Sequence, residues 1–120
     1  MTKIDSITGS QLMRLWGVSS WVDYTADYYL WQGCGVFVVI ERDSHVELHM
    51  AMKKDARHRC RDAVTDVLSL IGNRVIHAPI LCASKHVCNL ARKFGFHLQS
   101  DNVVKLIDGR SEQLFLMVRS

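Results

Sequence analysis

The chain has 120 residues, 48% of them hydrophobic, and a formal net charge of +3 at pH 7. This length and apolar fraction predict a single domain over residues 1–120 with a core of its own. One Pro, seven Gly and no low-complexity tract argue against a disordered tail, and the modest charge permits an anionic ligand without demanding nucleic acid.

Nothing in the sequence indicates a membrane span or a secretory leader. The apolar run Gly35 to Ile40 is too short to cross a bilayer, and the N-terminal residues lack a hydrophobic leader segment. The cysteines show no C-x-x-C spacing and are expected to be reduced thiols; they are Cys34, Cys60, Cys82 and Cys88. We therefore expect a cytoplasmic protein with no membrane partner.

The first 27 residues give the weakest periodicity. Ser10 is expected to cap a short helix over residues 11–16 that ends at Gly17. The region is rich in aromatic side chains, namely Trp16, Trp21, Tyr24, Tyr28, Tyr29 and Trp31. Two interpretations stay open: packing of a small domain, or an aromatic substrate cleft.

Three strands are expected next, over residues 28–31, 36–40 and 45–52, joined by short turns as an antiparallel meander. The middle strand is β-branched and apolar, which predicts burial on both faces. The third alternates apolar and polar side chains, so it should have two different faces.

A basic turn follows the third strand and leads into a helix over residues 59–71, with Gly72 as its C-cap. The turn carries one acid, Asp55, and five cations: Lys53, Lys54, Arg57, Arg59 and Arg61. Free N–H groups and the helix dipole favour an anion at such a position. Phosphate binding is the leading interpretation; nucleic acid or a merely solvated surface are the alternatives.

The second half predicts a strand over 74–81, parallel to 45–52 because a helix crossover joins them. Pro79 suits this strand only if the two separate towards that end. Ser84 should cap a second helix ending at Gly95, and Phe96 to Gln99 should begin a further strand. Residues 103–107 and 112–119 are expected to close the fold as a hairpin, giving a mixed α/β sheet.

This order of elements resembles the GNAT acyltransferase superfamily. The best local matches are Val46 to Met52 before the basic turn, Ala91 to Phe96, and a closing hairpin with Asp108-Gly109 and Leu114 to Met117. The resemblance covers about residues 28–119. The compact form is most similar to small GNAT-like proteins encoded by bacteriophages, which implies the host cytoplasm or a virion as its location.

The resemblance implies an acetyl-CoA-dependent N-acetyltransferase that acts on an amine of a small molecule or of a protein, such as a host protein. Acetyl-CoA would lie between strands 45–52 and 74–81, with its pyrophosphate on the N–H groups of residues 57–62. The cofactor-binding residues would be Met50, Ala51, Met52, Arg57, His58, Arg59, Cys60, Arg61, Asp62 and Ser84.

The chain departs from the family pattern at several of these positions. Cys60 and Asp62 stand where the family's turn has small residues, Ser84 replaces an Asn, and Ala91 replaces a Tyr that often acts as general acid. These departures favour an alternative: a GNAT fold retained without activity, as a virion component or a binder of a host protein.

Glu47 and His49 are the candidate catalytic residues because the period of two places them on one face of their strand. Either could take a proton from an amine, although Glu47 would need its pKa raised by burial. His77 on the neighbouring strand is a further candidate, and the bland alternative is a partly solvated polar face. No His or Cys pair has ligand spacing, so no metal is expected.

Overall fold

The computed structural model describes residues 1–81, 85–105 and 109–120. Its elements, in chain order, are β1 Thr2–Ile4, α1 Ser6–Trp16, β2 Asp27–Trp31, β3 Gly35–Glu41, β4 Val46–Met52, the 3-10 helix η1 Lys54–Arg59, α2 Cys60–Ile71, β5 Ile76–Leu81, α3 Lys85–Lys93, β6 His97–Lys105 and β7 Ser111–Arg119. The expected α/β class is confirmed.

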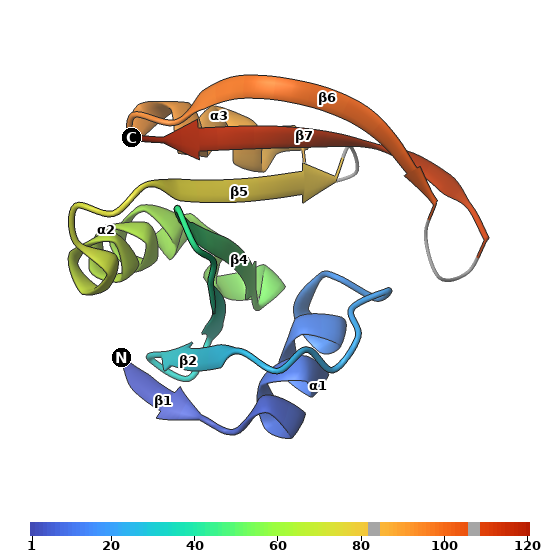
Figure 1. Cartoon of the computed structure of the whole chain (residues 1–120). Helices are drawn as coiled ribbons and strands as arrows, with labels where there is room; N and C mark the ends of the chain where they lie inside the picture. The colour runs from blue at the N-terminus through green and yellow to red at the C-terminus, as the bar shows by residue number, and fades with distance from the viewer. Residues whose placement is uncertain (82–84, 106–108) are drawn as a thin grey trace.

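Within these residues seven strands form one mixed sheet in the order β1-β2-β3-β4-β5-β7-β6 (Figure 1). Strands β1 to β4 are an antiparallel meander, β5 is parallel to β4, and β7 lies between β5 and β6 antiparallel to both. The meander of β2 to β4, the parallel crossover and the antiparallel pairing of the last two strands agree with the sequence prediction, whereas β1 was not predicted.

The parallel pair β4–β5 is short. It is registered at only two positions, Val46 with Ile76 and Glu47 with His77, after which the strands part. Pro79 lies beyond the last paired position and faces Leu116 of β7 in the ladder on the other side of β5. A residue without an N–H is tolerated there because β4 no longer needs a ladder bond from it.

Helices cover both faces of the sheet. Helices α2 and α3 pack on one face over Phe37, Leu48 and Ile76, among others, and α1 packs on the opposite face over Tyr28 and Val38. Val36 to Ile40 of β3 are buried throughout, as the β-branched run predicts. Alternate residues of β4 therefore serve two different cores.

The start of α1 differs from the prediction. The helix begins at Ser6, and its N-cap is Asp5, whose Oδ2 accepts the N–H of Thr8 at 3.0 Å. Ser10 lies inside the helix, is fully buried, and donates to the Tyr28 hydroxyl at 3.0 Å. The exposed Ile7 obscures the apolar period at the helix start, which is why the cap is misplaced by sequence alone.

The basic turn takes the form of the 3-10 helix η1, which runs directly into α2, in line with the expected order of strand, turn and helix. One further expectation is wrong. Residues 97–105 form one strand with an irregularity between Leu98 and Ser100, where two separate strands were expected. An edge strand that is mostly exposed tolerates polar residues such as Asp101 and Asn102, so they do not end it.

Candidate active site

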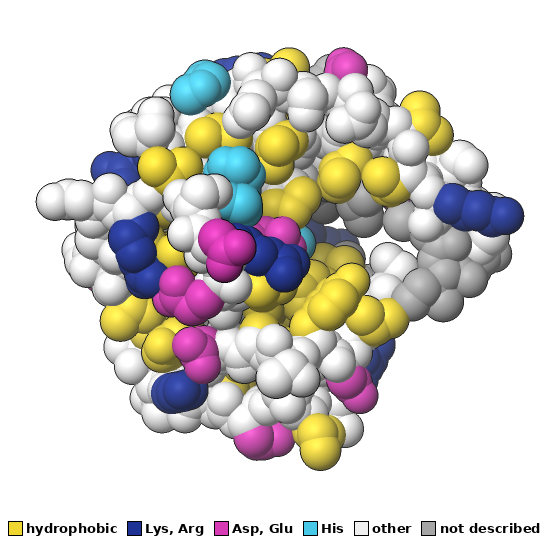
Figure 2. Space-filling model, in the orientation of Figure 1, with side chains coloured by type: hydrophobic (Ala, Val, Ile, Leu, Met, Phe, Trp, Pro, Cys, Tyr) yellow, Lys and Arg dark blue, Asp and Glu magenta, His cyan; other side chains and the backbone are white. Residues whose placement is uncertain are grey.

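A cavity of about 530 Å³ opens where β4 and β5 part. Figure 2 shows the hollow on this face of the molecule, with hydrophobic side chains along it. Its lining includes, from the segment after α1, Val18, Ser20, Trp21, Val22 and Tyr24; from β4, Glu47, Leu48, His49 and Met50; from β5, Ala78, Pro79 and Ile80; and from α3, Val87, Leu90 and Ala91. Cavities of this size hold small molecules.

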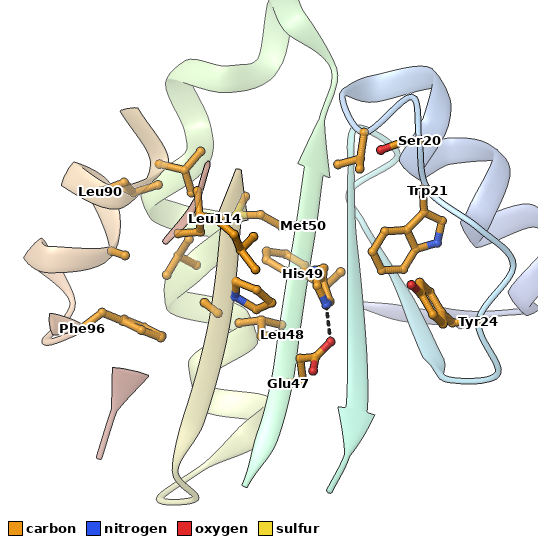
Figure 3. A pocket seen from close by; sticks show the side chains of 18 of the residues that line it. Ser20, Trp21, Tyr24, Glu47, Leu48, His49, Met50, Leu90, Phe96 and Leu114 are labelled. Atoms are coloured by element: carbon orange, nitrogen blue, oxygen red, sulfur yellow. Dashed lines mark hydrogen bonds and ion pairs between the residues drawn. The ribbon is translucent and has the colours of Figure 1, made fainter. Parts of the chain in front are cut away.

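The cavity has two sides, separated by the alternation of β4. Leu48 belongs to the core under α2 and α3, whereas Ala51 belongs to the core under α1. Glu47 and His49 therefore share the α1 face. Figure 3 shows Trp21 and Tyr24 on that side of β4 and Leu90 and Phe96 on the other. We call the side with Trp21 and Tyr24 the acceptor side of the cleft, and the side with Leu90 and Phe96 the helix side.

Glu47 and His49 form a close pair on the acceptor side. His49 Nε2 lies 2.6 Å from Glu47 Oε2 (Figure 3). Arg42 donates to Glu47 Oε1 at 3.3 Å. The hydrogen bond from His49 lowers the pKa of Glu47, outweighing partial burial, which raises it. Glu47 thus lacks the raised pKa that it would need to take a proton from an amine: the carboxylate is ionised at neutral pH and accepts hydrogen bonds.

This ionised carboxylate fixes the tautomer of the histidine. Nε2 of His49 must carry the hydrogen that Glu47 accepts, so Nδ1 of the neutral ring is left with its lone pair. Glu47 therefore orients the His49 ring through this hydrogen bond.

A buried hydrogen-bond network holds the aromatic wall of the acceptor side. The Tyr28 hydroxyl accepts from Ser10 Oγ at 3.0 Å and from Trp21 Nε1 at 3.2 Å, and donates to the Tyr24 carbonyl at 3.1 Å. The Trp21 ring packs edge-on against Tyr24 at 5.0 Å between centroids and against His49 at 4.8 Å. Trp21 is thus both a core residue and a wall of the cleft.

Two contacts of α1 fix the same segment. Arg14 donates to the Trp21 carbonyl at 3.2 Å and pairs with Asp23 at 2.9 Å. Gly9 lets the helix approach Tyr28 closely, because a Cβ there would lie 2.2 Å from Tyr28 Cδ2. The wall is therefore built from the N-terminal region, whose role the sequence left open between packing and substrate cleft.

His77, the further catalytic candidate, lies at the closed end of the strand pair. Its ring stacks on His45 with centroids 3.7 Å apart. Burial, and secondarily the His45 charge, lower its pKa. Neither histidine lines the cavity.

The basic turn lies outside the cavity, beside an open depression formed with the end of α1. Arg57 donates to the Trp16 carbonyl at 3.2 Å, and the Arg59 guanidinium lies 4.7 Å from the Trp31 ring centroid while it also bonds Gln32. The Cys60 N–H donates to the Arg57 carbonyl. Within the described part of the chain, Arg57 and Arg59 thus have partners in the protein, as do the backbone N–H groups of Lys53, Ala56 and Cys60.

Of the predicted site residues, the structure brings Glu47, His49 and Met50 together in the cleft. Ala51 faces the α1 core, and Met52 is buried with its sulfur 3.3 Å from Cys60 Sγ. Burial raises the pKa of that thiol. The exposed members of the turn include His58, Arg61 and Asp62; Ser84 lies outside the described residues. Sequence reasoning did not place Val18, Lys105 or Leu114 in the cleft.

The fold is similar to that of solved N-acetyltransferases. The ribosomal-protein-S18-alanine N-acetyltransferase from Escherichia coli aligns over 98% of this chain and 90% of its own, with a TM-score of 0.69 and 13% identity. A Bacillus subtilis acetyltransferase in complex with CoA aligns over 98% and 93%, with a TM-score of 0.61 and 17% identity. The chain has the GNAT fold.

A third GNAT structure shows the same core in a larger chain. It is a spermidine N-acetyltransferase SpeG chimera from Vibrio cholerae and hSSAT, with a TM-score of 0.64 and 14% identity. The alignment covers 78% of this chain and 64% of that one, so this chain spans less than two thirds of its length. The sequence itself matches no protein-family model and no curated protein.

The residues of this GNAT fold fit an acyl-CoA ligand in the cleft. The strands part beside Met50, which exposes a strand edge for the pantetheine amides, and the helix side is lined by apolar side chains. Among the described residues no group of three potential ligands could hold a metal ion. The described helices also include none with the length and apolar character of a membrane span.

Proposed function

We propose that this chain binds acetyl-CoA, or a related acyl-CoA, between β4 and β5 and transfers the acyl group to an amine. The observation that carries the proposal is the parting of β4 from β5 after Glu47, with the His49–Glu47 pair on the wall of the resulting cleft. The solved N-acetyltransferases of the same fold, one of them a CoA complex, support it.

The ligand would be held by three parts of the chain. The edge of β4 from Met50 to Met52 would pair with the pantetheine amides. Arg57, His58, Arg59 and Arg61 would surround the phosphates together with the backbone of Asp62. The apolar helix side, including Leu90 and Ala91, would exclude water from the acyl end.

Acetyl-CoA supplies a thioester carbonyl carbon that a neutral amine can attack. As the new C–N bond forms, the C–S bond of the thioester would break and CoA would leave as its thiolate, which takes up a proton from solvent. His49 Nδ1 accepts the proton that the amine must lose, directly or through a water. The Glu47 carboxylate stabilises the imidazolium that results, because it already accepts a hydrogen bond from Nε2 at 2.6 Å. Positioning of the amine against the thioester carbonyl contributes the rest of the rate enhancement.

Mass spectrometry tests this proposal without interference from the protein's own thiols. The protein is incubated with acetyl-CoA and a panel of small amines and peptides, and acetylated products are counted per enzyme molecule. Multiple turnovers for at least one amine are expected, with His49→Gln as the slow control. No product above the uncatalysed rate, together with no thermal stabilisation at millimolar acetyl-CoA, would contradict it.

A second candidate function is a binding protein on a GNAT fold without catalysis. It is favoured by Ala91, which lines the cleft where the family's pattern implies a Tyr, and by the Cys60 N–H, whose hydrogen bond to Arg57 leaves it unavailable to a phosphate. Multiple turnovers in the same assay would remove this candidate. Stable capture of one host protein without any turnover would support it.

A further inference from the structure

We infer that the acceptor side of the cleft binds a monoamine carried on an apolar, aromatic-sized body, and that it discriminates against polyamines. The inference rests on the proposed function, because the amine is an acceptor only if the chain transfers an acyl group to it. The chemical class of the amine is inferred from the side chains that line the cleft.

The first observation is the exposed Tyr24 ring. Tyr24 is 48% exposed, yet its backbone carbonyl is held by the Tyr28 hydroxyl and its ring packs against Trp21. An exposed aromatic side chain on such a fixed backbone offers a preorganised face to a ligand. It lies on the same side of β4 as the His49–Glu47 pair (Figure 3).

The second observation is that most of the wall beside Tyr24 and the His49–Glu47 pair is apolar, with Ser20 as a polar exception. Trp21, Val18 and Val22 line it from the segment after α1, and Pro79 lines it from β5. An aryl or branched alkyl group would be stabilised there by contact area and edge-to-face packing. A polar or charged chain would lose its hydration without gaining partners.

The third observation is the charge of the lining. Glu47 is the one acidic side chain that the described residues place in the cavity wall, and it is already paired with both His49 and Arg42. Lys105 adds a cation to the same cavity. One partly neutralised carboxylate can accommodate one ammonium beside the proton-accepting histidine.

A polyamine carries further ammonium groups, and each needs its own anionic or carbonyl partner when it leaves water. The cavity wall supplies no second carboxylate among the described residues, and Lys105 would repel an additional cation. Discrimination between a monoamine and a polyamine therefore follows from the count of available anions.

Isothermal titration calorimetry with 2-phenylethylamine and spermidine tests this inference, in saturating CoA and about 0.15 M salt. The wild-type protein should bind 2-phenylethylamine at least about tenfold more tightly than spermidine. Tyr24→Ala should weaken binding of 2-phenylethylamine about fivefold, and Tyr24→Phe should retain it. Leu70→Ala is the control, because Leu70 is 49% exposed on α2 and does not line the cavity.

Spermidine binding as tightly as 2-phenylethylamine, or an unchanged affinity in Tyr24→Ala, would overturn the inference. Acetyl transfer is measured separately on both amines. Preferential acetylation of spermidine would overturn the monoamine inference and leave the transferase proposal standing. Binding of 2-phenylethylamine that depends on Tyr24, without any acetylated product, would support the site and overturn the transfer.

Discussion

Glu47 and His49 lie two residues apart on β4, and their side chains meet at 2.6 Å on the face that Trp21 covers. The spacing is the period of a strand, so one local pattern both builds the sheet and assembles the pair. Because the pair lowers the pKa of Glu47, the two groups have different roles. In the proposed reaction His49 would exchange the proton, and Glu47 would act as a positioning residue.

Replacing His49 by Gln should lower kcat for acetyl transfer by about 10²–10⁴-fold, the usual contribution of a general base. The affinity for acetyl-CoA should stay unchanged, because His49 lies on the acceptor side. Steady-state kinetics and calorimetry measure the two quantities. His97→Gln is the matched control on an exposed residue outside the cavity, and an unchanged kcat in His49→Gln would refute the assignment.

The lowered pKa of Glu47 predicts a pH dependence of folding stability. Its ionised form is favoured by folding, so the stabilisation is complete above the ordinary value of 4.5 and is lost as the pH falls through the lower value of the folded state. Urea titrations of wild type and Glu47→Gln should therefore differ at pH 7 and converge in acid.

The causes of that pKa shift have an order that mutants can check. His49→Gln should reduce the acid dependence more than Arg42→Ala, because the hydrogen bond from His49 is the larger contribution and that from Arg42 the smaller. The reverse order, or a stability difference between wild type and Glu47→Gln that does not shrink as the pH falls, would show that another group dominates.

Gly9→Ala should destabilise the fold by about 1–3 kcal/mol or more, because the new Cβ would overlap the Tyr28 ring at 2.2 Å. Thermal unfolding measures the loss. Gly35→Ala is the control: its Cβ would lie 3.5 Å from the flexible Met52 side chain, an ordinary contact. Equal melting temperatures for wild type and Gly9→Ala would contradict the close approach of α1 to β2.

Arg57→Ala combined with Arg59→Ala should weaken CoA binding about tenfold and reduce its salt dependence, if the turn contacts the phosphates. Calorimetry at two salt concentrations is the measurement. Arg92→Ala with Lys93→Ala removes the same charge from the exposed end of α3. An equal loss in this control would mean that net charge acts, and no loss in either would place the phosphates elsewhere.

Local patterns made much of the fold predictable. The alternation in 45–52, the β-branched run 36–40 and Pro79 each carry a physical constraint that the structure obeys. The same alternation placed Glu47 and His49 side by side. The expected helix start at Ser10 is wrong because the Asp5 cap precedes an exposed Ile7, which weakens the periodic signal.

The acceptor side was not predictable to the same degree, because it is assembled by long-range contacts. Tyr28 bonds Ser10 and Trp21 across the α1 face, and no periodicity relates these positions. The 3-10 helix at the basic turn is likewise a tertiary outcome: Arg57 and Arg59 are held by the Trp16 carbonyl and the Trp31 ring.

Calorimetric titration of acetyl-CoA into wild type and Ala91→Trp tests the central claim most directly. Ala91 lines the helix side of the cleft, and an indole there would occupy the space assigned to the ligand. The account predicts saturable one-to-one binding by wild type and by the control Leu70→Trp, and its loss in folded Ala91→Trp. No saturable binding by wild type at millimolar acetyl-CoA, or equal binding by Ala91→Trp, would contradict it.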